Sequence, residues 1–228
     1  MGVTTEKLEQ SSLRDQVLAI LRKGLITGDL VPGELYSASA IATDLGVSTS
    51  PVREAMLTLV NQGVMEAVRN RGFRVIPMGQ QDRKNIHELR MLIEVPSMVR
   101  LAGEPRLKQQ AAKFRALAEQ NIAAAEEGDL VAYLNTDLRF HLGMLEILGN
   151  EKLTTLVEGL RDQTRQLGLK SFSRQESLRA TAQEHLLILD ALLDGEAERV
   201  EELMTAHLDH IVQDWEASDS AETSAASA

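Results

Sequence analysis

The 228-residue sequence predicts a mainly α-helical protein in two parts: an N-terminal winged helix-turn-helix, with helices and a small β-hairpin, and a C-terminal all-α six-helix bundle. Three observations favour this fold class. Leucine and alanine abound while aromatic residues make up only 3% of the chain, which favours helices packed on helices. Apolar residues recur at three- and four-residue spacing along most of the sequence. Two short β-prone runs flank an Asn/Gly turn near residue 70.

Composition excludes several classes of protein. Hydrophobic residues make up 43% of the chain, which is enough for a packed core. Cysteine is absent, so disulfides and thiolate metal sites are excluded, and any metal must be held by imidazole and carboxylate groups. The first residues are polar and no long apolar run follows, so we expect no secretion signal, no membrane partner and a cytoplasmic location.

The net charge of −10 is unevenly distributed. Residues 1–78 contain eight basic and eight acidic residues, whereas residues 79–228 contain 16 basic and 26 acidic ones. A neutral first part and an acidic second part suit a protein that presents one end to a polyanion.

Turn-forming and polar stretches divide the chain into five segments. The best linker is the Pro-Met-Gly sequence that begins at Pro77, and the C-terminal tail consists of small polar residues typical of disorder. The predicted segments are a flexible N-terminus at 1–11, a winged helix-turn-helix at 12–77, a linker at 78–80, a helical domain at 81–217 and a disordered tail at 218–228.

The N-terminal segment begins with two predicted helices. The first follows Ser12, whose hydroxyl can cap it, and ends at Gly28. The second is short, has Ser37 or Ser39 as its cap, and ends at Leu45 before a glycine.

A third predicted helix, residues 50–62, has Ser50 as its cap and Pro51 at the first helical position. In a helix-turn-helix this second helix of the pair enters the DNA major groove with its N-terminal residues at the base edges. Arg53 lies in that first turn, where a guanidinium can form two hydrogen bonds to guanine. Hydroxyl groups near the helix start suit phosphate or base contacts. They belong to Ser48, Thr49 and Ser50.

The β-prone runs at 64–68 and 73–76 predict the hairpin that forms the wing. Gly72 would let the wing tip approach the DNA backbone closely. Three basic residues of the wing are candidate DNA contacts: Arg69, Arg71 and Arg74. Taken singly these features also fit a solvated surface, and Arg53 could pair with Glu54. Together, at this spacing, they predict binding to double-stranded DNA.

The rest of the chain has helical periodicity interrupted by glycine-containing breaks. We expect six helices there, at residues 81–103, 105–127, 129–148, 150–171, 174–194 and 196–217.

Four ionisable residues fall on apolar faces of these helices. Asp137 and His141 are four residues apart on the third helix, while His185 and His207 align with leucines, methionine and valine on the fifth and sixth. Such groups are costly to bury unless they are paired or bind a metal. Three imidazoles and a carboxylate suit a divalent ion, first of all Zn²⁺, with Ni²⁺, Mn²⁺ and Fe²⁺ as alternatives.

The alternative for any one of these histidines is a hydrogen-bonded core residue. The remaining two histidines provide a contrast, because His87 and His210 align with charged and polar neighbours and we expect them to be solvated. Three histidines on apolar faces and two on polar faces favour a metal site over separate hydrogen-bonded core residues.

The N-terminal segment resembles GntR-type transcriptional regulators over about residues 12–77. The motifs that carry the resemblance are LVPGE (30–34), IATDLGVS (41–48), SPVREA (50–55) and RGFRV (71–75). The family often has arginines where Ser39 and Thr49 stand, and both usually help to read the operator. The resemblance therefore implies an altered base preference, with Arg53 retained.

The C-terminal segment resembles the FCD effector domain of the FadR-type branch, and six helices would indicate its VanR-like subgroup. The resemblance rests on ELRMLIE (88–94), DLRFH (137–141), GN (149–150), EH (184–185) and AHL (206–208). In that family one Asp and three His bind a divalent metal, and the matching positions are Asp137, His141, His185 and His207. The metal commonly anchors a carboxylate metabolite, which Arg90 could help to neutralise. The alternative for Arg90 is an ion pair with Glu94.

The resemblance implies a homodimeric, ligand-responsive regulator that binds a near-palindromic operator and a small organic acid, with repression as the commoner mode in the family. We expect the dimer contact on the first and fourth C-terminal helices. Two alternatives remain open: a metal-dependent hydrolase, against which no further catalytic base is evident, and a regulator whose metal is purely structural.

Overall fold

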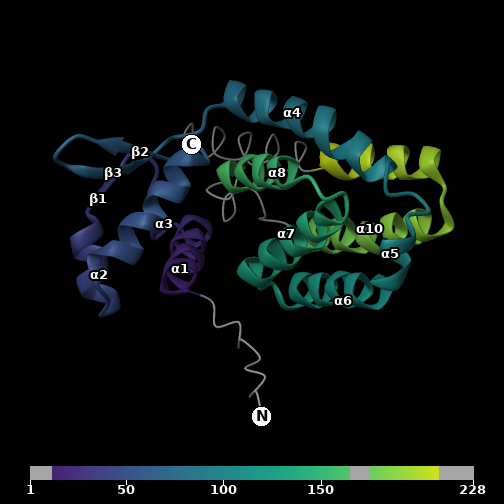
Figure 1. The fold of residues 1–228 in the computed structure, drawn as a ribbon, viewed down its shortest axis with the longest axis horizontal. Coiled ribbons are helices and arrows are strands. Elements are labelled where there is room, and N and C mark those ends of the chain that lie inside the picture. The colour runs from purple at the N-terminus through teal and green to yellow at the C-terminus, as the bar shows by residue number, and fades with distance from the viewer. Residues whose placement is uncertain (1–11, 165–174, 211–228) are drawn as a thin grey trace, which may run out of the picture.

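The computed structural model describes residues 12–164 and 175–210. The flexible N-terminus and C-terminal tail expected from the sequence, and the ends of the fourth and sixth C-terminal helices expected there, lie outside these residues. A small N-terminal domain carries the sheet, and helix α4 (Gln80–Val99) runs from it along the larger helical domain (Figure 1).

The N-terminal domain is a winged helix-turn-helix. Its sheet is antiparallel with strand order β1-β3-β2, and β1 is a two-residue strand that the sequence analysis did not predict. Its elements are α1 (Leu13–Thr27), β1 (Leu35–Tyr36), α2 (Ala38–Leu45), α3 (Thr49–Asn61), β2 (Met65–Val68) and β3 (Gly72–Val75).

The helix starts in this domain follow capping chemistry, with one correction. Ser12 caps α1 as predicted, its hydroxyl accepting from the Asp15 backbone N–H at 3.1 Å. Ser37, one of the two predicted candidates, is the N-cap residue of α2. The prediction for the third helix was wrong, because Ser48 rather than Ser50 is the N-cap residue of α3. Pro51 is then the third helical residue, where its missing N–H still costs nothing, since first-turn N–H groups have no partner within the helix.

Gly72 has a structural role that differs from the predicted one. Its φ is +123°, and a Cβ atom there would lie 2.4 Å from the Tyr36 carbonyl oxygen. The glycine is therefore required by the close approach of β3 to β1, irrespective of any DNA contact.

The helical domain contains six long helices within the described residues, as predicted, together with the short α5. The predicted helix 105–127 is divided at Gln110, whose φ and ψ of −106° and 8° end α5 and precede α6. The elements after α4 are α5 (Pro105–Gln109), α6 (Ala111–Glu127), α7 (Leu130–Ile147), α8 (Glu151–Thr164), α10 (Gln175–Asp194) and a last helical segment at residues 197–210.

The core of the helical domain lies between α4, α6, α7, α10 and the segment 197–210. Phe114 and Phe140 pack edge to face within it, with ring centroids 6.2 Å apart. This packing brings α7, α10 and the segment 197–210 together, and the polar site lies among them. In the part of the chain that the structure describes, no helix has the length and apolar character needed to cross a membrane.

Candidate metal centre and nucleic-acid interface

Asp137, His141, His185 and His207 meet in the interior of the helical domain. One possible ligand atom from each lies within 4.8 Å of all the others. The Nε2 atom of His141 lies 3.1 Å from that of His185 and 3.2 Å from that of His207. Asp137 Oδ1 lies 3.2 Å from His185 Nε2. The three helices that were predicted to carry these residues therefore bring all four together.

These side chains fit a divalent ion. Two nitrogens bound tetrahedrally at the usual Zn–N distance lie roughly 3.3 Å apart, close to the spacing of the three Nε2 atoms here. The three imidazoles are fully buried, and the Nδ1 atoms of His141 and His185 have no hydrogen-bond partner among the described residues. Within the described residues, the hydrogen-bond and ion-pair contacts of these two rings are therefore made through Nε2, at the centre.

Protonation states also favour a metal. Burial lowers the pKa of His141 and His207, which keeps both imidazoles neutral, the form that binds metals. Burial alone would raise the pKa of Asp137, but the Arg161 guanidinium and hydrogen bonds from His141 and His185 lower it well below its usual value. The donor set is therefore neutral nitrogens and an ionised carboxylate.

Glu184 orients one of the histidines, a role the sequence analysis missed. Its Oε2 lies 2.8 Å from His207 Nδ1. Because an ionised carboxylate can only accept, His207 Nδ1 is the donor, and its Nε2 lone pair faces the centre. The sequence contains one indication of this role, because Glu184 directly precedes the candidate metal ligand His185.

A buried charge network adjoins the centre. Arg161 of α8 donates through Nη1 to Asp137 Oδ2 at 2.8 Å and through Nε to Glu94 Oε2 at 3.0 Å. Arg90 donates through Nε to Glu94 Oε1 at 2.6 Å. Burial alone would raise the pKa of Glu94, but Arg161 and Arg90 lower it to about 2. All four side chains are ionised, and each carboxylate has a cationic partner.

The candidate effector residue Arg90 forms the ion pair with Glu94 that was its predicted alternative. Its Nη2 atom is nevertheless buried without a hydrogen-bond partner among the described residues. Arg161 was not among the predicted site residues, although it stands directly after the apolar residue Leu160.

The other two histidines lie outside the centre. The His210 side chain is 44% exposed and contacts Glu184 Oε1 through Nδ1 at 2.6 Å. The His87 side chain is only 22% exposed and its Nε2 lies 3.0 Å from Asp209 Oδ1, so this histidine is less solvated than predicted. Its partner belongs to the segment 197–210, which the sequence alone could not place beside α4.

The start of α3 presents the predicted DNA-contact residues to solvent. Ser48, Thr49, Ser50 and Arg53 are all exposed. Ser50 donates to Glu54 at 2.9 Å, and the Arg53 guanidinium lies 6.0 Å from the centre of the Phe73 ring. Glu54 is therefore bonded to Ser50 rather than to Arg53, and the Arg53 guanidinium lies over the Phe73 ring of β3.

The wing presents two of its three arginines as unpaired cations. Arg69 and Arg71 are exposed and form no ion pair with any residue the structure describes. Arg74 is half-buried and donates to Glu66 on β2 at 3.0 Å. Its charge is already compensated within the sheet.

A winged helix-turn-helix joined to a helical domain with a buried polar centre defines a DNA-binding regulator with a separate sensing domain. The family model described as bacterial regulatory proteins, gntR family, matches residues 13–75, and that of the FCD domain matches residues 85–210. The chain belongs to the GntR family and carries an FCD domain.

The chain is similar to named transcriptional regulators over most of its length. The chain is 25% identical to the HTH-type transcriptional repressor RspR of Escherichia coli over 211 residues, 92% of each chain. It is 31% identical to the E. coli HTH-type transcriptional regulator McbR over 156 residues, which cover 68% of this chain and 70% of McbR. The solved structure of E. coli McbR/YncC superposes with a TM-score of 0.77 at 25% identity, covering 90% of this chain and all of that one. These relatives are transcriptional regulators, so the chain is a regulator and not an enzyme.

Proposed function

We propose that this chain is a homodimeric transcriptional repressor whose FCD domain holds a divalent metal ion and a small carboxylate metabolite, and that this metabolite controls operator binding. The observation that carries the proposal is the convergence of three buried Nε2 atoms and one carboxylate oxygen within 4.8 Å. Repression is supported by RspR, which is named a repressor. A repressor that binds bacterial operator DNA would act in the cytoplasm, and this location is part of the proposal.

Asp137, His141, His185 and His207 would hold the ion, which supplies a positive charge able to anchor a carboxylate. Arg90 would add a second positive group, because the N–H groups of its buried Nη2 atom have no hydrogen-bond partner among the described residues and could donate to the carboxylate. Arg161 keeps Asp137 ionised and oriented. Glu184 keeps the His207 Nε2 lone pair directed inward.

The DNA-reading residues proposed are those at the start of α3 and on the wing. Arg53 would read base edges in the major groove, while Ser48, Thr49 and Ser50 would contact phosphates or bases. The wing cations Arg69 and Arg71, together with Gly72 directly after Arg71, would contact the DNA backbone. Arg74 would contribute less, because it already pairs with Glu66. A dimer would require a near-palindromic operator.

The dimer contact proposed is on α4 and α8. Three large hydrophobic side chains on these helices are exposed: Leu89 at 44%, Leu92 at 66% and Leu156 at 52%. A second copy covering them would remove apolar surface from water.

The test starts from DNA fragments selected by the purified protein. Affinity for the selected operator is measured by fluorescence anisotropy with metal-stripped protein, with zinc-loaded protein, and with zinc-loaded protein plus a panel of small mono- and dicarboxylates. We expect at least one carboxylate to change operator affinity by about 5- to 150-fold, only when zinc is present. If zinc removal unfolds the domain and no carboxylate changes affinity or melting temperature, the metal is purely structural.

A further inference from the structure

Helix α8 presents two consecutive charged residues to two different parts of the molecule. Arg161 faces the helical domain, where it contacts Asp137 and Glu94. Asp162, the next residue, faces the N-terminal domain and contacts Arg22 of α1. Both side chains are buried. One turn of helix therefore touches the candidate metal centre on one side and the DNA-binding domain on the other.

The contact with the N-terminal domain is a compact polar cluster. Arg22 donates through Nε to Asp162 Oδ2 at 2.7 Å and through Nη2 to Glu158 Oε1 at 2.8 Å. With its amide oriented to satisfy both neighbours, Gln62 donates to Asp162 Oδ2 at 3.1 Å and accepts from Arg22 Nη2 at 3.2 Å. We call Arg22, Gln62, Glu158 and Asp162 the Arg22 cluster.

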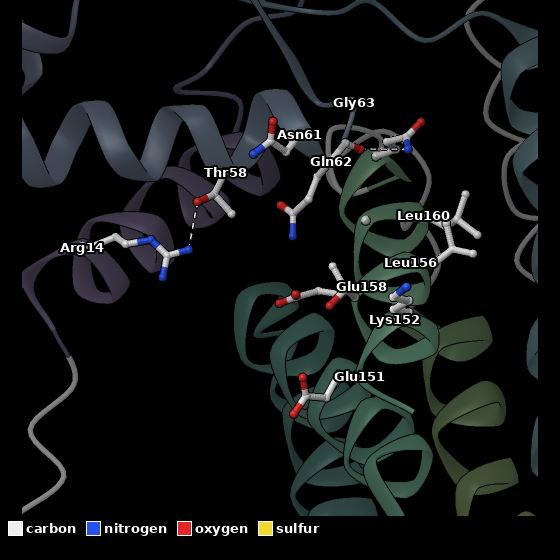
Figure 2. A pocket seen from close by; sticks show the side chains of 13 residues that line it. Arg14, Thr58, Asn61, Gln62, Gly63, Glu151, Lys152, Leu156, Glu158 and Leu160 are labelled. Atoms are coloured by element: carbon white, nitrogen blue, oxygen red, sulfur yellow. Dashed lines mark hydrogen bonds between the residues drawn. The ribbon is translucent and has the colours of Figure 1, made fainter. Parts of the chain in front are cut away.

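Beside this cluster the two domains are separated by a cleft of about 860 Å³. Figure 2 shows Arg14 and Thr58 on the side of the N-terminal domain, and Glu158 of α8 on the opposite side of the gap. The interface is thus polar and incompletely packed, a type that permits rearrangement between domains. Next to the Arg22 cluster, Gln163 adds a hydrogen bond from its Nε2 to the Gln62 carbonyl oxygen at 2.9 Å.

We propose that the Arg22 cluster fixes the orientation of the DNA-binding domain on α8, and that occupation of the metal centre changes this orientation through Arg161. The proposal rests on the function proposed above. Arg161 holds Asp137, a ligand of the centre, and Glu94, the partner of Arg90. A metal ion that binds the Asp137 carboxylate changes the contacts that fix this turn of α8. An anion that competes with the carboxylates for Arg161 and Arg90 does the same. Because Asp162 is the next residue, the Arg22 cluster is displaced with it.

The experiment measures the distance between the two domains. The chain lacks cysteine, so Asp44→Cys in the N-terminal domain and Glu119→Cys in the helical domain give two unique spin-label sites, both at exposed residues. Labelled chain is diluted with unlabelled chain so that only distances within one chain are recorded. Distance distributions are collected for metal-stripped protein, with zinc alone and with zinc plus acetate.

For the wild type we expect a narrow distribution without metal and a shifted one with zinc plus acetate. Arg22→Gln and Asp162→Asn should broaden the metal-free distribution, abolish the shift and leave zinc content unchanged. Arg199→Gln, which removes an exposed ion pair with Glu202 far from this interface, is the control and should behave as wild type. Circular dichroism confirms that each variant is folded.

The outcomes separate this proposal from the proposed function. Variants of the Arg22 cluster that keep the wild-type distribution and shift would overturn the role of the cluster. A wild type that binds zinc without any shift would contradict the coupling while leaving the metal centre intact. A folded wild type that takes up no zinc would contradict the proposed function as well, and the coupling with it.

Discussion

At the scale of single residues, Glu184 contacts two histidines, and only one of them faces the metal centre. His207 Nδ1 lies 2.8 Å from one of its oxygens and His210 Nδ1 lies 2.6 Å from the other. His207 is fully buried, whereas 44% of the His210 side chain is exposed. The two histidines form a matched pair three residues apart on one helix.

His207→Ala should therefore reduce the metal content of the purified protein sharply, because it removes one of three nitrogen ligands. His210→Ala should leave the content at the wild-type level. Elemental analysis by mass spectrometry measures both. An equal loss in the two variants would mean that the assignment of inward and outward histidines is wrong.

Glu184→Ala should weaken zinc binding by about 10- to 100-fold, because outer partners that orient a ligating imidazole contribute on this scale. Competition with a chelating dye measures the affinity. His210→Ala again serves as the control, since it removes the other contact of Glu184. Unchanged affinity in Glu184→Ala would show that the His207 ring is held by packing alone.

Arg53→Ala should lower affinity for the selected operator by about 5- to 150-fold, the range for one lost bidentate contact to guanine. Non-specific affinity, dimerisation and metal content should not change. Arg199→Ala, an exposed arginine of the helical domain, is the charge-matched control. Retained discrimination between operator and random duplex in Arg53→Ala would refute its role.

Sequence periodicity predicted the four candidate ligands because each residue's face follows from its own helix. It could not predict Arg161 or Glu94 as neighbours of the centre. Their pairing joins α8 to α4 and α7, and spacing within one helix contains no information about contacts between helices. Arg90 shows the same limit, since its i,i+4 pair with Glu94 was foreseeable and the buried Nη2 atom was not.

At the scale of elements, Glu94 connects α4 to α8 by accepting from Arg90 and Arg161. Glu94→Gln leaves two buried guanidinium groups without their shared carboxylate, and we expect it to lower the free energy of unfolding by about 3–5 kcal/mol. Glu202→Gln, which affects an exposed pair with Arg199, should cost less than about 1 kcal/mol. Urea denaturation compares the two. Equal effects would show that the buried network does not join these helices.

The same groups predict how stability depends on pH in the metal-free protein. His141 and His207 have lowered pKa values in the folded state, so the unfolded chain binds more protons once the pH falls below 6.5. Glu94 has a folded-state pKa of about 2, so its contribution is lost as the pH falls from 4.5 toward that value. The free energy of unfolding should decrease as the pH falls below about 7, and more steeply once the pH falls below 4.5. A constant value between about pH 7 and pH 5 would contradict the buried neutral histidines.

Among the elements, the long helices could be predicted because their apolar periodicity extends over many turns. Strand β1 could not, because two residues carry no periodicity and the strand exists only through its pairing with β3. The division between α5 and α6 at Gln110 was missed for a similar reason, since no glycine or proline marks it.

At the scale of the whole molecule, the proposed dimer depends on exposed leucines of α4 and α8. Leu92→Glu should convert the dimer to a monomer, because a carboxylate at the centre of an apolar contact is desolvated without a partner. Leu187→Glu changes an equally large side chain on α10 that is 52% exposed, and it should remain dimeric. Light scattering coupled to size-exclusion chromatography measures the mass. A dimeric Leu92→Glu variant would place the contact elsewhere.

The metal centre is tested most directly by X-ray absorption spectroscopy of the full chain loaded with zinc. We expect one ion per chain with Zn–N distances of about 2.0–2.1 Å and the outer-shell scattering of three imidazoles, reduced in His207→Ala. Zinc that is not retained in stoichiometric amount, or a spectrum without imidazole scattering, would show that the four side chains do not form a metal centre.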